Sequence, residues 1–205
     1  MGEYLHHLVK SILKMIIMDD EERLDLHRYW EARARTYYVP DVYGRETLRA
    51  FIKKLNPQPS SFIEVGVGRG ELMPLYRHFP RVVGVDFSKG MIRESQRRID
   101  RHNYNIELFH LDVTEGHLKE KFDLLITRTV LMHIHPDDIE AACENVAQMS
   151  DRLYIFEYSE ELLVKKLAPH NWLHDYQALF NNLGYETVEA YVRGDQPQVL
   201  FHFKR

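Results

Sequence analysis

The chain has only one cysteine, Cys143, among its 205 residues. A single cysteine excludes an internal disulfide and a cysteine-cluster metal site. Its place in Ile139-Glu140-Ala141-Ala142-Cys143 indicates a helix packed into the core. The sequence also lacks an apolar run long enough to span a membrane, and no small-residue cleavage site follows an apolar start. We therefore expect a cytoplasmic protein.

Neither sign of charge is in large excess. Lys and Arg number 27 against 31 for Asp and Glu, so the net charge is -4. This balance does not indicate a general phosphate-binding surface, which disfavours nucleic acid as a partner but leaves a local basic patch open. With 44% hydrophobic residues, the chain suits one domain plus a short extension.

Glycine is scarce, with 10 residues in all, and three of them fall in one short segment. The apolar stretch Phe62-Ile63-Glu64-Val65 leads directly into Gly66-Val67-Gly68-Arg69-Gly70. Glycines at such a turn let the backbone approach a ligand, and the N–H groups that open the following helix attract an anionic group. The next apolar run ends at Asp86, about twenty residues on, where a carboxylate can accept hydrogen bonds from ribose hydroxyls. The spacing predicts a nucleoside-cofactor site.

The G-x-G-x-G spacing, with Glu64 just before it, resembles motif I of the class I S-adenosyl-L-methionine (SAM)-dependent methyltransferases. Three later segments are similar to further motifs of that family and follow in the right order. They are Phe109-His110-Leu111-Asp112-Val113, Phe122-Asp123-Leu124-Leu125-Ile126-Thr127-Arg128 and Val130-Leu131-Met132-His133-Ile134. The resemblance covers roughly residues 44 to 205 and implies a SAM-dependent methyltransferase.

The same resemblance implies which residues contact the cofactor. Glu64 helps to hold the methionine ammonium, and Asp86 holds the ribose. Gly66, Gly68 and Gly70, with the backbone of their loop, contact the methionine part. Phe87 lies against the adenine ring, Asp112 accepts from the adenine amino group, and Val113 supplies a backbone N–H. Thr127 lies beneath the methyl group.

Short apolar runs alternate with amphipathic segments, which predicts an α/β fold with a doubly wound, mostly parallel sheet. Ser88 is placed to cap the third helix. Residues 185–192 and 199–204 flank a Gly194-Asp195 turn and indicate a β-hairpin, which by resemblance is an antiparallel ending to a seven-stranded sheet. The other predicted strands are 61–65, 81–86, 105–111, 122–127 and 152–157, and the predicted helices are 46–55, 71–78, 89–101, 136–149 and 172–183.

Residues 1–43 are expected to form a helical extension to a Rossmann-like domain of residues 44–205. Apolar residues between Leu5 and Ile16 recur at helical spacing. The apolar face of this helix needs a partner, which is the domain itself, a second subunit of a homodimer, or a membrane surface. The protein is therefore expected to be a monomer or a homodimer.

A second helix of the extension carries Trp30 and is followed by Tyr37 and Tyr38. In related methyltransferases an N-terminal segment rich in such aromatics folds over the cofactor as a lid. By that resemblance these side chains wall the methyl group, and packing into the core is the alternative.

Methyl transfer is an in-line displacement, so the protein must align donor and acceptor and take a proton from a hydroxyl or carbon acid. The polar and aromatic cluster at residues 170–176 opens the helix before the hairpin, on the expected cofactor rim. His174 is the first candidate for the general base, and His170, His133 and His135 are alternatives, because an imidazole accepts a proton near neutral pH.

The candidate substrate-binding residues are Trp30, Tyr38, Arg128 and His133. Arg128 either binds an acidic acceptor or pairs with a buried carboxylate. We expect no metal, because His133-Ile134-His135 has no second ligand pair at a suitable spacing. Glu157 opens a segment faintly similar to the paired glutamates of arginine methyltransferases, but the surrounding pattern is absent.

These features predict a SAM-dependent methyltransferase that acts on a small molecule at oxygen or carbon. Thr127-Arg128-Thr129-Val130 lacks the Asn-Pro-Pro-Tyr that family members use on adenine or glutamine amide nitrogens, which disfavours those acceptors. Two alternatives stay open. One is methylation of a protein side chain or RNA, and the other is a non-catalytic SAM-binding subunit.

Overall fold

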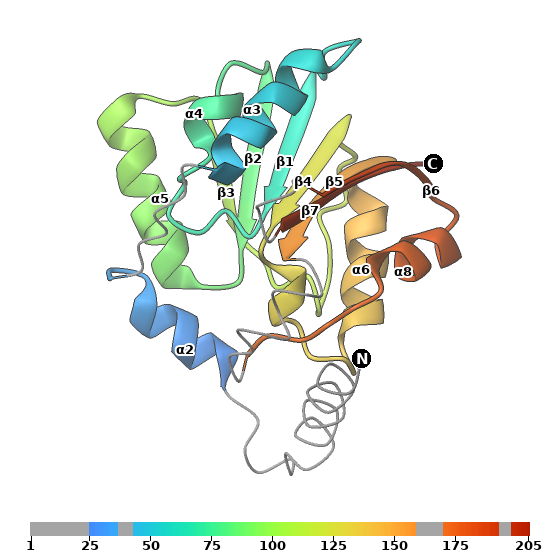
Figure 1. Ribbon diagram of the computed structural model, residues 1–205. Coiled ribbons are helices and arrows are strands. Elements are labelled where there is room, and N and C mark those ends of the chain that lie inside the picture. Colours follow the sequence, from blue (N-terminus) through green and yellow to red (C-terminus); the bar gives the residue numbers. More distant parts are fainter. Residues whose placement is uncertain (1–24, 37–42, 159–169, 193–197) are drawn as a thin grey trace.

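A computed structural model describes residues 25–36, 43–158, 170–192 and 198–205. Within these ranges a seven-stranded sheet has the order β3-β2-β1-β4-β5-β7-β6 (Figure 1). The strands are β1 (Ser61–Val65), β2 (Arg81–Asp86), β3 (Glu107–His110), β4 (Leu124–Arg128), β5 (Arg152–Tyr158), β6 (Glu186–Val192) and β7 (Gln198–Lys204). The helices are α2 (Leu26–Arg33), α3 (Tyr43–Lys54), α4 (Met73–Tyr76), α5 (Lys89–His102), α6 (Ile139–Met149) and α8 (Tyr176–Asn182), with a 3-10 turn, η2 (Leu131–His133).

The sheet is parallel from β3 to β5 and ends in an antiparallel hairpin. β1 pairs in parallel with both β2 and β4, and β7 pairs antiparallel with β5 and β6. These pairings confirm the predicted fold class. Because the winding direction reverses at β1, a crevice is expected beyond the carboxyl ends of β1, β2 and β4.

The two faces of the sheet are covered by different helices, because successive strand residues point to opposite sides. Ile63 of β1 packs with α6 and α8, whereas its neighbour Phe62 packs with α3, α4 and α5. Cys143 lies buried in the α6 layer, as its sequence setting predicts. The core thus has two layers of helices around one sheet.

Some helices begin where the sequence predicts and others begin later. The last helix begins at Tyr176 and not at residue 172, because the Asp175 carboxylate accepts the Ala178 N–H at 2.9 Å. The helix predicted from Pro136 begins at Ile139. Ser88 caps α5 as predicted, with its hydroxyl oxygen accepting the Met91 N–H at 3.2 Å.

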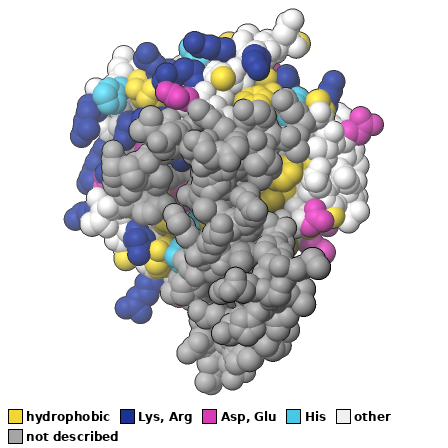
Figure 2. All heavy atoms as spheres, in the orientation of Figure 1, with side chains coloured by type: hydrophobic (Ala, Val, Ile, Leu, Met, Phe, Trp, Pro, Cys, Tyr) yellow, Lys and Arg dark blue, Asp and Glu magenta, His cyan; other side chains and the backbone are white. Residues whose placement is uncertain are grey.

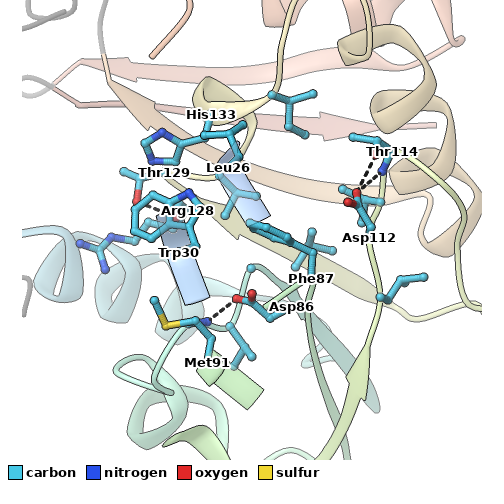
Figure 3. Close-up of a pocket in the computed structure, with 18 of the residues that line it drawn as sticks. Leu26, Trp30, Asp86, Phe87, Met91, Asp112, Thr114, Arg128, Thr129 and His133 are labelled. Atoms are coloured by element: carbon cyan, nitrogen blue, oxygen red, sulfur yellow. Dashed lines mark hydrogen bonds between the residues drawn. The ribbon is translucent and has the colours of Figure 1, made fainter. Parts of the chain in front are cut away.

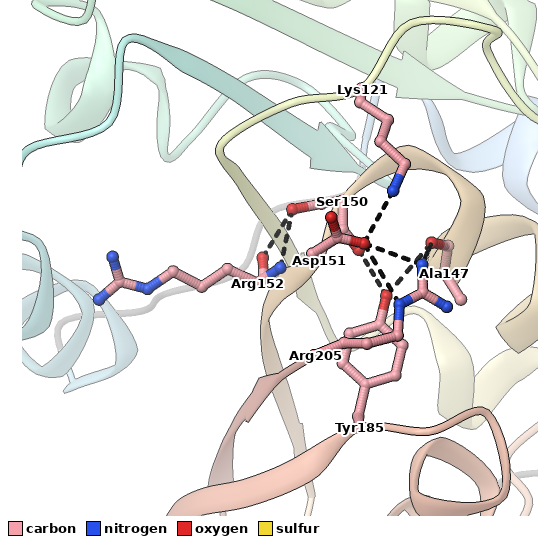
Figure 4. Close-up of polar contacts among 7 residues, drawn as sticks. All are labelled: Lys121, Ala147, Ser150, Asp151, Arg152, Tyr185 and Arg205. Carbon is pink, nitrogen blue, oxygen red and sulfur yellow. Dashed lines mark hydrogen bonds and ion pairs between the residues drawn. The ribbon is translucent and has the colours of Figure 1, made fainter.

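A polar network fastens the C-terminal hairpin to the amino end of β5 (Figure 4). Asp151 accepts from Lys121 and from Arg205, each at 2.8 Å, and the Tyr185 hydroxyl donates to the carbonyl of Ser150 at 2.5 Å. In the parallel part of the sheet the crevice lies at the other ends of the strands, so this network supports the fold without lining the site.

Basic side chains gather on one layer of the molecule. Figure 2 shows Lys and Arg over the region formed by α3 and α5. The sequences of α3 and α5 contain the following Lys and Arg residues: Arg45, Arg49, Lys53, Lys54, Lys89, Arg93, Arg97, Arg98 and Arg101. We call these residues the basic face. The overall balance of charge therefore hides a local basic patch.

Several predictions fall outside the described ranges. They concern the helix between Leu5 and Ile16, the aromatic residues Tyr37 and Tyr38, and the Gly194-Asp195 turn. The hairpin that flanks this turn is present. In the described part of the chain, no helix is long and apolar enough to cross a membrane.

Candidate functional site

A cavity of about 420 Å³ lies beyond the carboxyl ends of β1, β2 and β4, where the sheet topology predicts a crevice. Figure 3 shows Trp30, Arg128 and His133 on one side of it, and Asp112 with Thr114 on the other. Its wall brings together most of the residues singled out from the sequence: Trp30, Glu64, Gly66, Gly68, Asp86, Phe87, Asp112, Val113, Arg128, His133 and His135.

The glycine loop after β1 forms the floor of the cavity. A Cβ atom on Gly66 would lie 2.1 Å from Cγ2 of Val130, so only glycine lets the loop pass this side chain. At Gly68 the nearest atom to an added Cβ is 3.8 Å away, and the backbone has a φ of 56°, which favours glycine. Gly70 packs against Met73 and does not line the cavity. The loop backbone is thus open to a ligand at Gly68.

Asp86 ties the end of β2 to this loop. Its Oδ2 accepts the Gly68 N–H and its Oδ1 accepts the Ser88 N–H, each at 2.9 Å. Burial raises the pKa of Asp86 to about 6, against the opposing effect of the two N–H donors. Each carboxylate oxygen can accept a further bond, so the group can hold a ribose diol facing the cavity.

Glu64 lies at the base of the cavity and is 3% exposed. The Tyr76 hydroxyl donates a hydrogen bond to it. Burial raises the pKa of Glu64 to about 8, although Tyr76 and the nearby Arg128 favour the carboxylate. A cation brought into the cavity would favour ionisation further, so Glu64 suits an ammonium ligand.

Asp112 lies at the opposite end of the cavity. Its Oδ1 accepts from the Thr114 N–H at 2.9 Å and the Thr114 hydroxyl at 2.7 Å. Its Oδ2 lies 3.1 Å from Nε2 of His27, whose ring meets the Phe87 ring edge-on at 4.8 Å. Sequence reasoning missed His27, because α2 carries no motif that links it to the residues after β3.

The last residue of β4, Arg128, and the turn that follows it, with His133, face the cavity. Thr129 has a φ of 50°, which β-branched residues rarely adopt. Oε1 of Glu157, a fully buried side chain of β5, accepts the N–H groups of Val130 and Leu131 at 3.1 Å each. No role for Glu157 is predicted from the sequence, whereas in the structure its carboxylate holds this turn.

His133 is the histidine whose geometry fits a proton acceptor. Its Nδ1 lies 3.0 Å from the His170 carbonyl oxygen, which only accepts, so Nδ1 carries the proton and Nε2 is the basic nitrogen. Burial lowers the pKa of His133 to about 4, although the bonds to His170 and Asn171 oppose this. The ring is therefore neutral at physiological pH. It packs against Trp30 at 5.0 Å.

Besides Gly70, three predicted site residues lie away from the cavity wall: His174, His170 and Thr127. Nε2 of His174 donates to the Ile134 carbonyl at 2.9 Å, and His170 packs behind His133 against Tyr29. Thr127 is buried within β4, so that Arg128 is the residue of this strand end that faces the cavity. As the general base, this geometry favours His133, one of the alternative candidates from the sequence, over His174 and His170. Among the described residues, no three His, Cys, Asp or Glu side chains form a metal site.

Residues 62–151 match a family model described as a methyltransferase domain. Over 99 residues the chain is 30% identical to the release factor glutamine methyltransferase of Geobacter sulfurreducens. That match covers 47% of this chain and 34% of the relative, so it spans about a third of the relative's length.

Solved structures extend the similarity to most of the chain. Magnesium protoporphyrin IX methyltransferase from Synechocystis PCC 6803 with bound S-adenosylhomocysteine (SAH) has a TM-score of 0.70 at 16% identity, over 88% of this chain and 95% of that one. The DhpI-SAM-HEP complex has a TM-score of 0.63 at 20% identity, over 87% and 94% of the two chains. At such identities the likeness establishes the fold.

Proposed function

We propose that this chain is a class I SAM-dependent methyltransferase that transfers a methyl group to a small molecule at oxygen or carbon. One observation carries the proposal. Glu64, Asp86 and Asp112 lie at or just beyond the carboxyl-terminal part of three neighbouring strands, and all three line the same cavity as Gly68. SAM offers each acid a partner, namely an ammonium, a ribose diol and an adenine amino group.

The acids would orient the cofactor along the cavity, with its methionine part at the glycine loop and its adenine at Phe87. When bound, SAM supplies a methyl group on a sulfonium that leaves as a neutral thioether. The protein's task is then to hold donor and acceptor in line and to exclude water.

The acceptor would lie against Trp30, Arg128 and His133, which all line the cavity on the side of β4. We assign the general base to His133, because its Nδ1–H is held by a carbonyl and its Nε2 can take the acceptor's proton. Trp30 of α2 lines this side of the cavity, which supports a small acceptor. Thr127-Arg128-Thr129-Val130 differs from the Asn-Pro-Pro-Tyr motif of enzymes that methylate amide nitrogens, which disfavours a glutamine side chain as the acceptor.

The basic face favours a second candidate, methylation of RNA. Clustered Lys and Arg side chains attract a phosphate backbone, and such binding weakens steeply with salt. An RNA acceptor would therefore bind this chain in a salt-dependent manner, whereas a small acceptor in the cavity would show little such dependence.

The test begins with calorimetric titration of the full chain with SAM, SAH and NAD. The same samples then receive fractionated small metabolites or RNA, and SAH formation is measured. Selective binding of the sulfur nucleosides with turnover on a metabolite fraction supports the proposal. Turnover on RNA alone supports the second candidate. Binding without any turnover indicates a non-catalytic subunit, and absence of binding to SAM and SAH refutes the cofactor assignment.

A further inference from the structure

α2 is joined to the core by a carboxylate that meets the start of another helix. Glu31 accepts the Gly90 N–H at 2.7 Å and the Ser88 hydroxyl at 2.9 Å through the same oxygen, Oε2. Its Oε1 accepts from Arg93 at 2.5 Å. These partners belong to the cap and first turns of α5, which begins directly after the Asp86-Phe87 segment of the cavity. Figure 1 shows α2 beside this end of α5.

The start of α5 is suited to hold a carboxylate. Its first N–H groups lack partners within the helix, and the helix dipole favours a negative charge there. The Gly90 N–H is the main cause that lowers the pKa of Glu31, so the group is ionised at neutral pH. The pair with Arg93 is exposed on both sides, 62% and 41%, and contributes little. The bonds to Gly90 and Ser88 are therefore the essential ones.

Gly90 also permits the close approach of α2. A Cβ atom at this position would lie 2.7 Å from Cβ of Ala34 and 3.0 Å from both carboxylate oxygens of Glu31. Behind this contact Trp30, Ala34 and Met91 are buried together. The sequence thus places a residue without a side chain where the two helices touch.

Held in this way, α2 spans the cavity from one end to the other. His27 meets the one Asp112 oxygen that Thr114 leaves unoccupied, and it contacts the ring of Phe87. One turn further on, Trp30 meets His133. Both are wall residues. The same helix therefore touches the adenine end and the acceptor end.

We propose that Glu31 is a positioning residue for nucleoside binding, which holds α2 on α5 so that His27 and Trp30 complete the wall of the cavity. The inference rests on the proposed function, since it takes a sulfur nucleoside as the ligand. Glu31 itself does not line the cavity. Glu31 must therefore affect ligand binding indirectly, by setting the position of α2.

The experiment measures SAH affinity by calorimetry for the full-length protein and four variants. Glu31→Ala should raise the Kd for SAH at least about tenfold, because it removes charge-assisted bonds that hold the wall. Glu31→Gln keeps an oxygen for the Gly90 N–H and the Ser88 hydroxyl and should restore most of the affinity. Gly90→Ala should weaken binding by separating the helices. Glu94→Ala is the matched control, because Glu94 pairs with Arg97 on α5.

A second readout follows α2 directly. The chain has two tryptophans, and Trp172→Phe leaves Trp30 as the sole fluorophore. In this background Glu31→Ala should shift the emission of Trp30 to longer wavelength and increase its quenching by acrylamide, while Glu94→Ala should leave both unchanged. A general loss of folding would instead appear as a lowered thermal midpoint with loss of the far-ultraviolet dichroism signal.

The outcomes separate the two proposals. If the unmodified protein does not bind SAH, the proposed function fails, and the role of Glu31 fails with it. If the unmodified protein binds SAH and Glu31→Ala binds equally well, only the role of Glu31 is refuted. Weaker SAH binding with unchanged Trp30 emission also refutes it, because the loss would then not pass through α2.

Discussion

At the end of the cavity proposed to hold the cofactor, Asp86 and Asp112 each accept a backbone N–H from two residues further along the chain, whereas the proposed acceptor end is assembled from distant segments. Asp86 bonds to Ser88, two residues away. By contrast, Tyr29 and His170, which support Trp30 and His133, are 141 residues apart. The local sequence of strand, loop and helix therefore determines the proposed cofactor end, whereas tertiary packing determines the proposed acceptor end.

The largest effect is expected at the acceptor end. His133→Gln should lower kcat at least about a hundredfold, because it removes the general base, while SAH affinity stays near that of the unmodified protein. Since burial lowers the pKa of His133 to about 4, the base is neutral down to about pH 5, and turnover should not fall near pH 6.5 as it would for an ordinary histidine. Steady-state kinetics from pH 5 to 8 measure both.

His174→Gln is the control for this substitution. His174 is partly buried and also has a lowered pKa, but its Nε2 donates to the Ile134 carbonyl and it is not in the cavity wall. Its loss should leave kcat nearly unchanged. A large loss in His174→Gln together with full turnover in His133→Gln would return the base to the position first favoured by the sequence.

At the cofactor end, Asp86→Asn should weaken SAH binding at least about tenfold, because the amide has one acceptor oxygen where the carboxylate has two. Calorimetry gives the affinity. Asp123→Asn is the matched control. Asp123 also accepts two backbone N–H groups, from Ser60 at 2.7 Å and from Ser61 at 3.0 Å, but it lies at the opposite end of β1 from the cavity. Equal losses in both variants would mean that Asp86 acts only through folding.

These two ends were unequally accessible to sequence reasoning. Strands β1 and β2 have the predicted bounds, because their apolar runs are closed by the glycine loop and by Asp86. Glu64 and Asp86 belong to these same short segments, and Asp112 belongs to the segment that follows β3. The sequence does not reveal the roles of His27, Glu31 and Glu157, because each contacts a part of the chain far away in sequence. Glu31 and Gly90, for example, are 59 positions apart. No local pattern records such a contact.

A smaller effect should appear in the pH dependence of Glu64. Its pKa in the folded protein is about 8, above the ordinary value of 4.5, so unfolding at pH 7 releases a proton. The contribution of Glu64 to stability is therefore full below about pH 4.5 and is lost as the pH rises through about 8. Binding of an ammonium to the carboxylate also releases a proton, so SAH affinity should rise between pH 6 and pH 8.

Calorimetry in two buffers of different ionisation enthalpy counts the released protons. Glu64→Gln cannot release one, and its binding should lose the part of the pH dependence above pH 7. The remaining dependence below pH 7 belongs to Asp86, whose pKa is about 6. Identical proton release in Glu64→Gln and the unmodified protein would show that Glu64 does not contact the ammonium.

The smallest effect concerns the turn that presents the acceptor residues. Glu157→Gln keeps an oxygen that accepts the Val130 and Leu131 N–H groups. Burial raises the pKa of Glu157 to about 7, so the neutral amide resembles the protonated carboxyl that is already populated at neutral pH. We expect kcat to change only slightly. Glu157→Ala leaves both donors unpaired, which costs about 1–3 kcal/mol of stability for each buried donor, and it should lower kcat while SAH affinity is kept. Parallel losses of kcat and SAH affinity in Glu157→Ala would mean that the two ends of the cavity are not built independently.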